Sequence, residues 1–425
     1  MRLLYSALFY CLLPFIVLRM LWRSRGAPDY RRRLGERFGL FSPRVGLDQP
    51  AIWVHAVSVG EILAAVALIE QLLRELPGRP LVVTTTTPTG SDRVRALFGE
   101  RVFHVYAPWD TPGAVRRFLR RTRPQLLLLM ETELWPNMLH YSHAGGCRIL
   151  LANARMSGRS ARGYARVEKL TRAMLGKLDT VACQSAADAD RFVELGLAPR
   201  ALQVTGSIKF DIELASELRE RAQLLRAGLA MRLRPVVLAA STHRGEEEQI
   251  LAAFALLRQQ FSDCLLVLVP RHPERFEEVN SLCASAGWQV VRRSAGINPQ
   301  AEDDIVLGDT VGELLLLYGA ATVAVVGGSL VDHGGHNVLE PAAWGVPVVT
   351  GPHMENFTAI ADSLVAAGAM IRLDDTARLG ACLVELLGQP ERCRQMGSAG
   401  RQVVADNRGA SQRLLALVQD LLVGR

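Results

Sequence analysis

Residues 323–349, VAVVGGSLVDHGGHNVLEPAAWGVPVV, contain the pattern that decides the fold. An apolar, β-branched strand over Val323–Val326 runs into a pair of glycines, a glycine- and histidine-rich loop opens a short helix that carries Glu340, and a further strand follows. Glycines at such a turn let backbone N–H groups approach a phosphate, and a helix N-terminus supplies partial positive charge. Glu340 is placed to bond hydroxyls of a ribose or sugar. The stretch therefore predicts a nucleotide site in a parallel α/β sheet.

Length and composition predict a two-domain globular protein with an anionic partner. The chain has 425 residues, which is long for one hydrophobic core. Its net charge of +7 indicates phosphates, nucleic acid or a membrane face as the partner. The seven cysteines are odd in number and never spaced as C-x-x-C, so neither a zinc ribbon nor a disulfide framework follows. The chain also lacks G-x-x-x-x-G-K-[ST] and is therefore not a P-loop enzyme.

An apolar stretch over residues 3–21 is long enough to cross the hydrocarbon core of a bilayer. The basic residues that follow it place the rest of the chain in the cytoplasm by the positive-inside rule; they are Arg23, Arg25, Arg31, Arg32, Arg33 and Arg37. A cleaved signal peptide is the alternative, but it needs its positive region before the apolar stretch, where only Arg2 stands. We expect a retained signal-anchor over residues 1–25, which either spans the bilayer or lies in one leaflet.

From residue 51 short apolar strands alternate with helical segments, which is typical of parallel βαβ units. The first series of strands is predicted over 51–55, 80–85, 101–106, 125–130, 148–153, 180–184 and 203–206. A polar helical segment over 211–232 follows, and a second series is predicted over 235–240, 264–269, 289–292, 304–307, 322–326 and 347–350. Ligands of such sheets bind at the carboxyl ends of the strands. Loops of both domains should therefore face one cleft.

Two acidic motifs follow strands of the first series. HAVSVGE, over 55–61, ends in Glu61 at a helix start, where a carboxylate either complements the helix dipole or acts as a general base. ETELWPN, over 131–137, places Glu131 directly after an apolar strand. Here the alternative to function is helix capping by Thr132 or Glu133, with the tryptophan in the core. Glu131, nearest to the strand end, is the better functional candidate.

Basic and polar loops end other strands. Lys209 follows the last strand of the first series and could neutralise a phosphate or carboxylate, or be a solvated linker lysine. Arg271 follows a strand of the second series and fits an anion clamp, because arginine binds in a bidentate manner. The loop over 241–246 is similar, and the threonine-rich run over 84–90 is either a capped turn or a phosphate contact. Convergence of three loops of the second domain favours a binding site.

These motifs, in this order behind an N-terminal anchor, resemble the Kdo transferases of lipopolysaccharide biosynthesis. This is the family of 3-deoxy-D-manno-octulosonic acid transferases, which are inverting glycosyltransferases with the GT-B fold. The resemblance covers essentially the whole chain. It rests on HAVSVGE at 55–61, ETELWPN at 131–137, GSIKFD at 206–211, PRHPER at 270–275 and the GGS…GGHNVLEPA run at 327–342.

The resemblance implies roles for individual residues. Glu61 would be the base that deprotonates a sugar hydroxyl of the lipid A precursor, and Glu131 and Lys209 would be catalytic residues that stabilise the transition state. The cytidine monophosphate part of the donor would be held by Pro270, Arg271, Val311, Gly312, Glu313, Asn337, Val338, Leu339 and Glu340. No metal and no other cofactor is implied; His333 and His336 lie three apart without a third ligand of matching spacing.

The expected fold is α/β and GT-B-like, with two Rossmann-type domains facing a cleft behind the anchor helix. Residues 26–210 would form the acceptor-binding domain, and 211–425 the donor-binding domain with the closing C-terminal helices. The expected reaction moves Kdo from CMP-Kdo to lipid IVA on the cytoplasmic side of the inner membrane, with no nucleic acid as partner. The alternatives are another GT-B enzyme that uses a UDP-sugar, such as a lipid-linked sugar transferase or an epimerase, and a non-catalytic nucleotide-sugar-binding protein.

Overall fold

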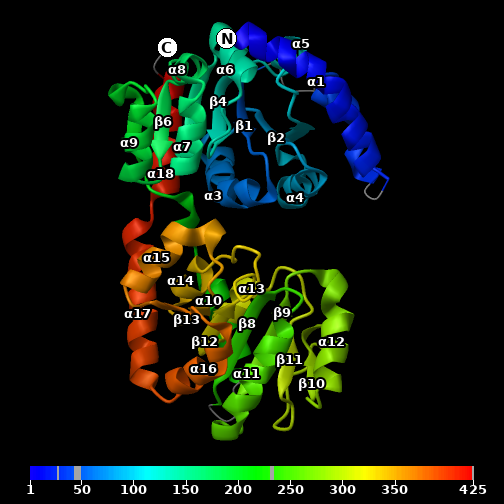
Figure 1. Ribbon diagram of the computed structural model, residues 1–425, viewed down its shortest axis with the longest axis vertical. Helices are drawn as coiled ribbons and strands as arrows, with labels where there is room; N and C mark the ends of the chain where they lie inside the picture. The colour runs from blue at the N-terminus through cyan, green and yellow to red at the C-terminus, as the bar shows by residue number, and fades with distance from the viewer. Residues whose placement is uncertain (26–27, 43–48, 230–233, 424–425) are drawn as a thin grey trace. The chain divides into compact units, whose positions relative to one another are not determined.

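The computed structural model describes residues 1–25, 28–42, 49–229 and 234–423, which form two compact units. Unit 1 comprises Met1–Asp211 together with Arg408–Arg425, and unit 2 comprises Ile212–Asn407. Each unit is built on one parallel sheet with helices on both of its faces (Figure 1). The two α/β domains expected from the sequence are thereby confirmed, whereas the cleft between them stays a prediction.

Within the described residues, unit 1 has a seven-stranded sheet in the order β3-β2-β1-β4-β5-β6-β7. Its strands are β1 (Ala51–His55), β2 (Leu81–Thr85), β3 (Phe103–Tyr106), β4 (Pro124–Met130), β5 (Arg148–Ala154), β6 (Thr180–Cys183) and β7 (Leu202–Val204). Its helices are α1 (Arg2–Arg23), α2 (Leu34–Arg37), α3 (Val59–Glu75), α4 (Pro88–Phe98), α5 (Pro112–Thr122), α6 (Pro136–Ala144), α7 (Gly158–Ala165), α8 (Glu168–Leu175), α9 (Ala186–Glu194) and α18 (Ala410–Val423).

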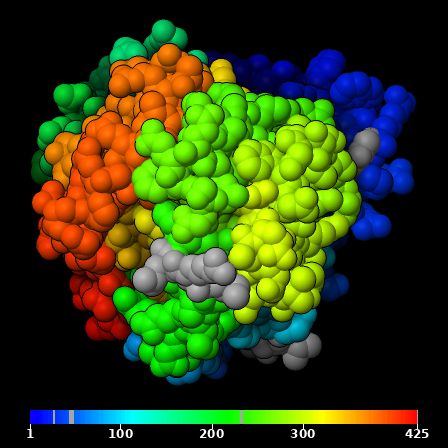
Figure 2. All heavy atoms as spheres, turned by 90° about the horizontal axis from the view of Figure 1, so that it is seen from below, coloured from blue at the N-terminus to red at the C-terminus, as the bar shows by residue number. Residues whose placement is uncertain are grey.

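Unit 2 repeats this plan, with seven strands among its described residues in the order β10-β11-β9-β8-β12-β13-β14. They are β8 (Val236–Thr242), β9 (Leu265–Pro270), β10 (Val290–Arg292), β11 (Ile305–Leu307), β12 (Val323–Val326), β13 (Val348–Thr350) and β14 (Met370–Arg372). The helices are α10 (Ser216–Leu229), α11 (Glu247–Gln260), α12 (Phe276–Ser285), α13 (Leu314–Tyr318), α14 (Leu339–Trp344), α15 (Thr358–Ala366), α16 (Leu379–Leu387) and α17 (Pro390–Asn407). Viewed from below, the lower end of this unit presents packed atoms coloured green to orange (Figure 2).

Both sheets are covered on two faces because successive residues of a strand point to opposite sides. In β1, Trp53 belongs to one buried cluster of unit 1, whereas Ile52 and Val54 belong to the other. In β8, Val237 and Leu238 divide in the same way between the two clusters of unit 2. Burial on both faces explains why the strands read as continuous apolar runs.

The order of the strands fixes where a ligand can bind. In unit 1 the sheet grows from β1 toward β3 in one direction and from β4 toward β7 in the other, so the connections reverse between β1 and β4. In unit 2 the same reversal lies between β8 and β12. Ligands of open α/β sheets bind outside the carboxyl ends of the strands at such a switch point.

The sequence predictions of the elements need three corrections. β14 was not predicted, because its residues continue the apolar stretch that begins in α15, and the sequence alone did not separate the strand from the preceding helix. The helical segment expected over 211–232 is α10, which begins at Ser216, and residues 230–232 lie outside the described residues. The second domain was expected to extend to residue 425, but this is wrong for the last helix, α18, which belongs to unit 1. α18 packs in unit 1, since Leu414 and Val418 are buried against the α3 side of the first sheet.

Candidate functional site

Glu61 lies in the first turn of α3, directly after β1 at the switch point of unit 1. The side chain of Ser58 caps this helix by accepting the N–H of Glu61. In return the carboxylate of Glu61 accepts the N–H of Val57 at 2.7 Å and the hydroxyl of Ser58 at 2.8 Å. This reciprocal capping box fixes the side chain at the helix start. Burial raises the pKa of Glu61 despite these bonds, and the charge of Glu131 raises it further.

Glu131 follows β4 on the other side of the same switch point. Its φ of 56° lies in the left-handed region, which a residue other than glycine rarely adopts. The N–H of Glu131 donates to the carbonyl of Ala152 at 2.9 Å, which ties the residue to the end of β5. Its Oε1 lies 3.7 Å from Nζ of Lys209, and both side chains are about three-quarters buried (26 % and 23 % exposed). The strained backbone therefore directs Glu131 toward a partly buried cation.

Lys209 belongs to a short 3-10 turn, η4 (Ile208–Phe210), that is held on both sides. Before it, the N–H of Ile208 donates to Oδ1 of Asn153 at 3.2 Å. After it, the carboxylate of Asp211 accepts the N–H groups of Gly409 and Ser411, both at 2.6 Å. Asp211 thereby joins η4 to the start of α18. The alternative reading of Lys209 as a solvated linker lysine is wrong, since the turn is part of the unit 1 core.

Glu133 was considered from the sequence only as a capping residue, and the structure gives it another place. Neither Thr132 nor Glu133 caps α6, whose N-cap is Trp135 without a side-chain bond. Instead Oε2 of Glu133 accepts the indole N–H of Trp135 at 2.9 Å. Burial raises the pKa of Glu133 to about 7, and the charge of Glu61 contributes to the rise. Trp135, two residues after Glu133, could have indicated this role from the sequence. A partly buried indole N–H requires a hydrogen-bond acceptor, and Glu133 is an acceptor close to it in the chain.

Threonines of the run over 84–90 are occupied within the protein. Oγ1 of Thr84 accepts the indole N–H of Trp53 at 2.8 Å and lies 2.9 Å from Nδ1 of His55. Thr87 caps α4 by accepting the N–H of Gly90. This loop is the capped turn that was one of its two interpretations.

In unit 2 the glycine turn after β12 already holds an anion of the protein. The carboxylate of Glu246, which is fully buried, accepts the N–H groups of Gly328, Ser329 and Leu330 at 2.7 to 3.1 Å. It also accepts the N–H of His243 at 2.8 Å. A Cβ on Gly327 would lie 2.9 Å from Oε2 of Glu246, so the glycine permits this close approach. The expectation that these N–H groups receive a phosphate is therefore wrong.

Four histidines meet beside this turn, although they come from three loops. Nε2 of His243 lies 2.8 Å from Nε2 of His336, so one ring donates and the other accepts. The ring of His333 lies 4.2 Å from that of His243, and His272 lies 5.4 Å from it, edge to face. Burial lowers the pKa values of His243 and His336 to about 4, so both rings are neutral near pH 7. Positive charge at this place must come from other groups.

Arg271 supplies that charge. It follows β9, is exposed, and acts on His243, His336 and Glu340 electrostatically. The neighbouring Arg275 forms a buried ion pair, with Nη1 2.7 Å from Oε1 of Glu247. Among the residues that the structure describes, Arg271 forms no such pair. It is therefore the arginine of this motif that remains open to an anionic ligand.

The other predicted donor-binding residues differ in what they can offer. Pro270, Val338 and Leu339 are buried, so they can contact a ligand only through the main chain. Glu340 accepts from Nδ2 of Asn337 at 3.0 Å. The carboxylate of Glu313 is held by Arg293 and by the hydroxyl of Thr310, at 3.1 and 2.6 Å. The adjoining turn at Val311 and Gly312 is exposed.

Comparison with known proteins decides the family. Residues 32–212 match the model of the family described as 3-deoxy-D-manno-octulosonic-acid transferase (kdotransferase). The 3-deoxy-D-manno-octulosonic acid transferase of Haemophilus influenzae is 40 % identical over 99 % of both chains. That of Bordetella pertussis is 39 % identical over 95 % of this chain and 96 % of its own. The chain belongs to the Kdo transferase family.

Solved structures at low identity show the fold of this Kdo transferase. A glycosyltransferase from Rickettsia africae is 13 % identical and has a TM-score of 0.57, covering 89 % of this chain and 100 % of that chain. A UDP-GlcNAc 2-epimerase from Neisseria meningitidis gives the same identity, TM-score and coverage. These structures confirm the GT-B-like fold. The classification of the chain as a glycosyltransferase rests on its membership of the Kdo transferase family.

The predicted catalytic residues of the Kdo transferase are close to one another within unit 1. Glu131 lies beside Lys209, and the charges of Glu61, Glu131 and Glu133 act on one another. The predicted donor-binding residues lie in the loops after β9, β11 and β12 of unit 2. Each set therefore gathers at the carboxyl ends of its own sheet.

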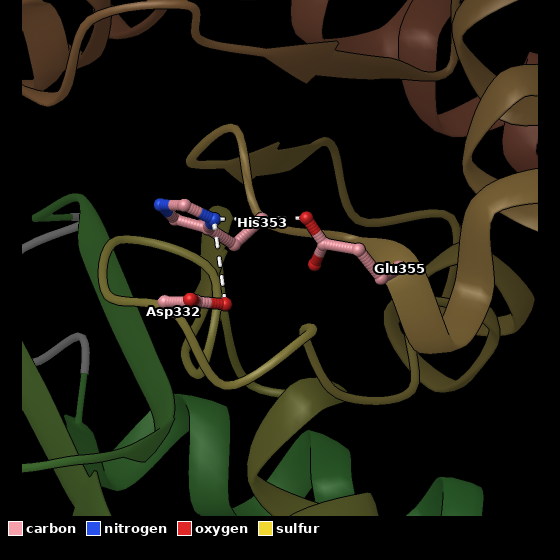
Figure 3. Close-up of side chains that lie close together, drawn as sticks. All are labelled: Asp332, His353 and Glu355. Carbon is pink, nitrogen blue, oxygen red and sulfur yellow. Dashed lines mark ion pairs between the residues drawn. The ribbon is translucent and has the colours of Figure 1, made fainter.

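A further cluster of possible ligand atoms lies on the surface of unit 2. Nδ1 of His353 lies 3.9 Å from Oδ1 of Asp332 and 3.6 Å from Oε1 of Glu355 (Figure 3). The two carboxylates are well exposed, at 88 % and 64 %. Both face the same nitrogen, so this is a solvent-screened ion-pair group and nothing about it requires a metal.

Proposed function

We propose that this Kdo transferase moves Kdo from CMP-Kdo to the lipid A precursor lipid IVA, with inversion and without a metal ion, in lipopolysaccharide biosynthesis. The observation that carries the proposal is the group of side chains at the switch point of unit 1. There a carboxylate with a raised pKa, Glu61, lies in the electrostatic field of Glu131, which is itself next to Lys209.

Glu61 is the proposed general base. Its raised pKa brings it closer to the pH at which the enzyme works, and a base is most effective when these two match. The N–H of Val57 and the hydroxyl of Ser58 orient its carboxylate. Glu61 takes the proton of the sugar hydroxyl of lipid IVA while that oxygen attacks the anomeric carbon of Kdo. Attack from the side opposite the leaving CMP inverts the configuration.

Glu131 and Lys209 are the proposed residues that stabilise the transition state. Nζ of Lys209 lies 3.7 Å from Oε1 of Glu131, a distance at which the carboxylate holds the ammonium in place without a tight bond. A preorganised cation in a partly buried site stabilises developing negative charge strongly, because it does not reorganise during the reaction.

The donor is proposed to bind unit 2, and unit 1 to bind the acceptor. CMP-Kdo carries a phosphate and a carboxylate, both suited to bidentate binding by Arg271. The nucleotide would contact the main chain of Pro270 and of Val338–Leu339, with the Val311–Glu313 turn and the Asn337–Glu340 pair beside it. When the bond to CMP breaks, charge develops on the phosphate. Fixed donors can stabilise this charge in the absence of a metal ion.

We place the enzyme at the inner membrane with both units on the cytoplasmic side. Among the described residues, α1 is the helix long and apolar enough to cross a membrane. The arginines after it favour a cytoplasmic location of the following chain, and they would attract anionic phospholipids and a bisphosphorylated acceptor. α1 is proposed to be retained as the single anchor.

The test replaces Glu61 and measures binding and transfer separately. We expect Glu61→Ala to abolish transfer of Kdo to lipid IVA, followed by product mass, while CMP still raises the melting temperature as in the wild type. Glu75→Ala, at the exposed end of the same helix, is the matched control and should keep full activity. Near-normal turnover of the Glu61 variant would remove it from the mechanism.

The nucleotide distinguishes this function from the main alternative, an enzyme that uses a UDP-sugar. We expect CMP to raise the melting temperature of the wild type, and UDP at the same concentration to leave it unchanged. Arg271→Met should reduce the shift with CMP. Protection by UDP and not by CMP would contradict the proposed donor.

A further inference from the structure

The first turns of α1 are joined to unit 1 by hydrogen bonds. Nη1 of Arg2 donates to Oδ1 of Asn137 at 2.9 Å and to the hydroxyl of Tyr141 at 3.3 Å. The hydroxyl of Ser6 donates to the same Oδ1 at 3.1 Å. Figure 1 shows the start of the helix beside α6, which carries both partners. Residues near the beginning of the apolar stretch thus lie against the folded domain.

The partner of these bonds is part of the unit 1 core. Asn137 is fully buried, and its Nδ2 donates to the carbonyl of Asp110 at 2.7 Å. The carboxylate of Asp110, also buried, accepts the N–H groups of Asn137 and Met138 at 2.9 and 2.7 Å, and the hydroxyl of Tyr5 donates to it. Removing α1 would leave buried acceptors without these donors, at a cost of about 1–3 kcal/mol for each. The contact between α1 and unit 1 is therefore a buried hydrogen-bond network and not a loose surface contact.

The middle and the end of α1 contact the same unit. The hydroxyl of Tyr10 accepts the N–H of Gly113, at the start of α5, at 3.3 Å. The guanidinium of Arg23 lies over the ring of Tyr30 in η1 (Pro28–Tyr30), 4.7 Å from its centroid. Contacts at the beginning, middle and end show that the helix runs along unit 1 and does not project from it.

This course is incompatible with a helix that crosses the bilayer. A helix of 22 residues is about 33 Å long, close to the roughly 30 Å of the hydrocarbon core. If Arg23 stood at the cytoplasmic surface of a spanning helix, Arg2 would reach the opposite surface. It could not then bond to Asn137, which belongs to the same folded unit as Tyr30. Both ends of α1 must lie on the side of the membrane that carries unit 1.

The rest of the helix surface is open and mostly apolar, with Arg19 as an exposed cation among the apolar side chains. Leu4, Leu8, Phe15 and Trp22 are 58–69 % exposed. Beside the helix, Arg116, Arg117 and Arg120 of α5 line a cavity of about 710 Å³, to which Gly113 and Tyr141, both in contact with α1, also contribute. An apolar helix face next to clustered arginines matches the acyl chains and the phosphates of one leaflet.

We infer that α1 is an in-plane anchor that inserts one face into a single leaflet, with the α5 arginines at the lipid phosphates and both helix ends on the side of unit 1. The occupant of the exposed face is an anionic phospholipid leaflet. This inference does not depend on the donor or acceptor of the reaction.

The first test is a cross-link in native membranes. Cys11, which is exposed on α1, is replaced by serine in every variant. With cysteines at Arg2 and Tyr141, we expect a short bifunctional maleimide to join the two positions within one chain, as identified by peptide mass. Cysteines at Trp22 and Tyr141 are the matched control, and should not be joined. Absence of the first cross-link in membranes would overturn the inference, and links between two chains would assign the face to a second copy.

The second test measures depth and needs no contact to unit 1. Single cysteines at Leu4, Phe15 and Trp22 carry a fluorophore, in vesicles of phosphatidylethanolamine and phosphatidylglycerol with lipid-bound quenchers. An in-plane helix should give the same shallow depth at all three positions, in the leaflet on the protein's side. Deep insertion at Phe15 with Leu4 in the opposite leaflet would show a spanning helix. Lack of quenching at all three would exclude lipid as the occupant.

Discussion

The three carboxylates at the switch point of unit 1 differ in how far the sequence revealed them. Glu61 and Glu131 were predicted because each follows an apolar strand, and the strand order then places them side by side. The state of Glu133 could not be predicted, because its pKa depends on burial and on the charge of Glu61, which is distant in the sequence. The position of a residue relative to a strand can be read from the sequence, whereas the desolvation of its side chain cannot.

Glu133 should make the stability of the enzyme depend on pH. Its pKa is about 7 in the folded protein against an ordinary 4.5, so the folded state holds this proton more tightly than the unfolded chain. The contribution to stability is complete below pH 4.5 and is lost as the pH rises through 7, by about 3 kcal/mol. We expect Glu133→Gln, which can still accept from Trp135, to raise the melting temperature over wild type more at pH 8 than at pH 5.

The control for this prediction is Glu194→Gln at the exposed end of α9. It should give the same difference in melting temperature from wild type at both pH values. An equal effect of Glu133→Gln at pH 5 and pH 8 would show that Glu133 keeps an ordinary pKa.

Lys209 is one of three lysines in the chain, which provides a matched comparison. Because it is the cation next to Glu131, we expect Lys209→Met to lower kcat by about 10²- to 10³-fold, as loss of one preorganised charge does. Lys177, whose Nζ donates to a carbonyl at the exposed end of α8, is the control, and Lys177→Met should leave kcat unchanged. Kdo transfer measured by product mass decides between them. A threefold loss or less at Lys209 would assign it a structural role.

At the scale of elements, the turn after β12 shows where a motif can mislead. The glycine pair was predicted to receive a phosphate, because glycine turns bind anions through their N–H groups. The turn does bind an anion, but it is the carboxylate of Glu246, 82 residues earlier in the chain than Gly328. Anion binding by the N–H groups of this turn was predicted correctly, whereas the identity of the anion was not. No local pattern distinguishes an internal carboxylate from a ligand phosphate.

Glu246 is therefore expected to support the fold of unit 2. Its carboxylate accepts four N–H groups, and the side chain is fully buried. Glu246→Gln keeps the size but replaces one acceptor with a donor that faces those N–H groups, so we expect a loss of about 2–4 kcal/mol. The melting temperature measures it. Glu248→Gln, exposed on α11, should have no effect, and an equally stable Glu246 variant would contradict the internal-anion role.

At the scale of the whole molecule, the sequence predicted two α/β domains and nearly all their strands, with ends within two or three residues of those observed. Long apolar runs bounded by glycine and proline carry this information locally. The place of α18 was missed, because its apolar face could pack on either sheet. The decision depends on the shape of the α3 side of unit 1 and on the bonds from Asp211, which are tertiary features.

α18 should stabilise unit 1 and not unit 2. Leu414 is fully buried in the cluster shared with α3, so Leu414→Ala should cost about 2–5 kcal/mol. Amide hydrogen exchange would then speed up in β1 and α3 and stay unchanged in β8. Leu224→Ala, at a position 75 % exposed on α10, is the control and should alter neither unit. Faster exchange in unit 2 alone would contradict the assignment of α18.

The return of the chain to unit 1 has a consequence for how the protein is connected. The backbone passes between the units twice, after Asp211 and after Asn407. Unit 2 is therefore one continuous segment inserted into unit 1, which is made of two separate segments of the chain. A single backbone cut in either connection leaves the two units covalently joined. Any rotation of one unit against the other must bend both connections at once, and this restricts twisting more than a single tether would.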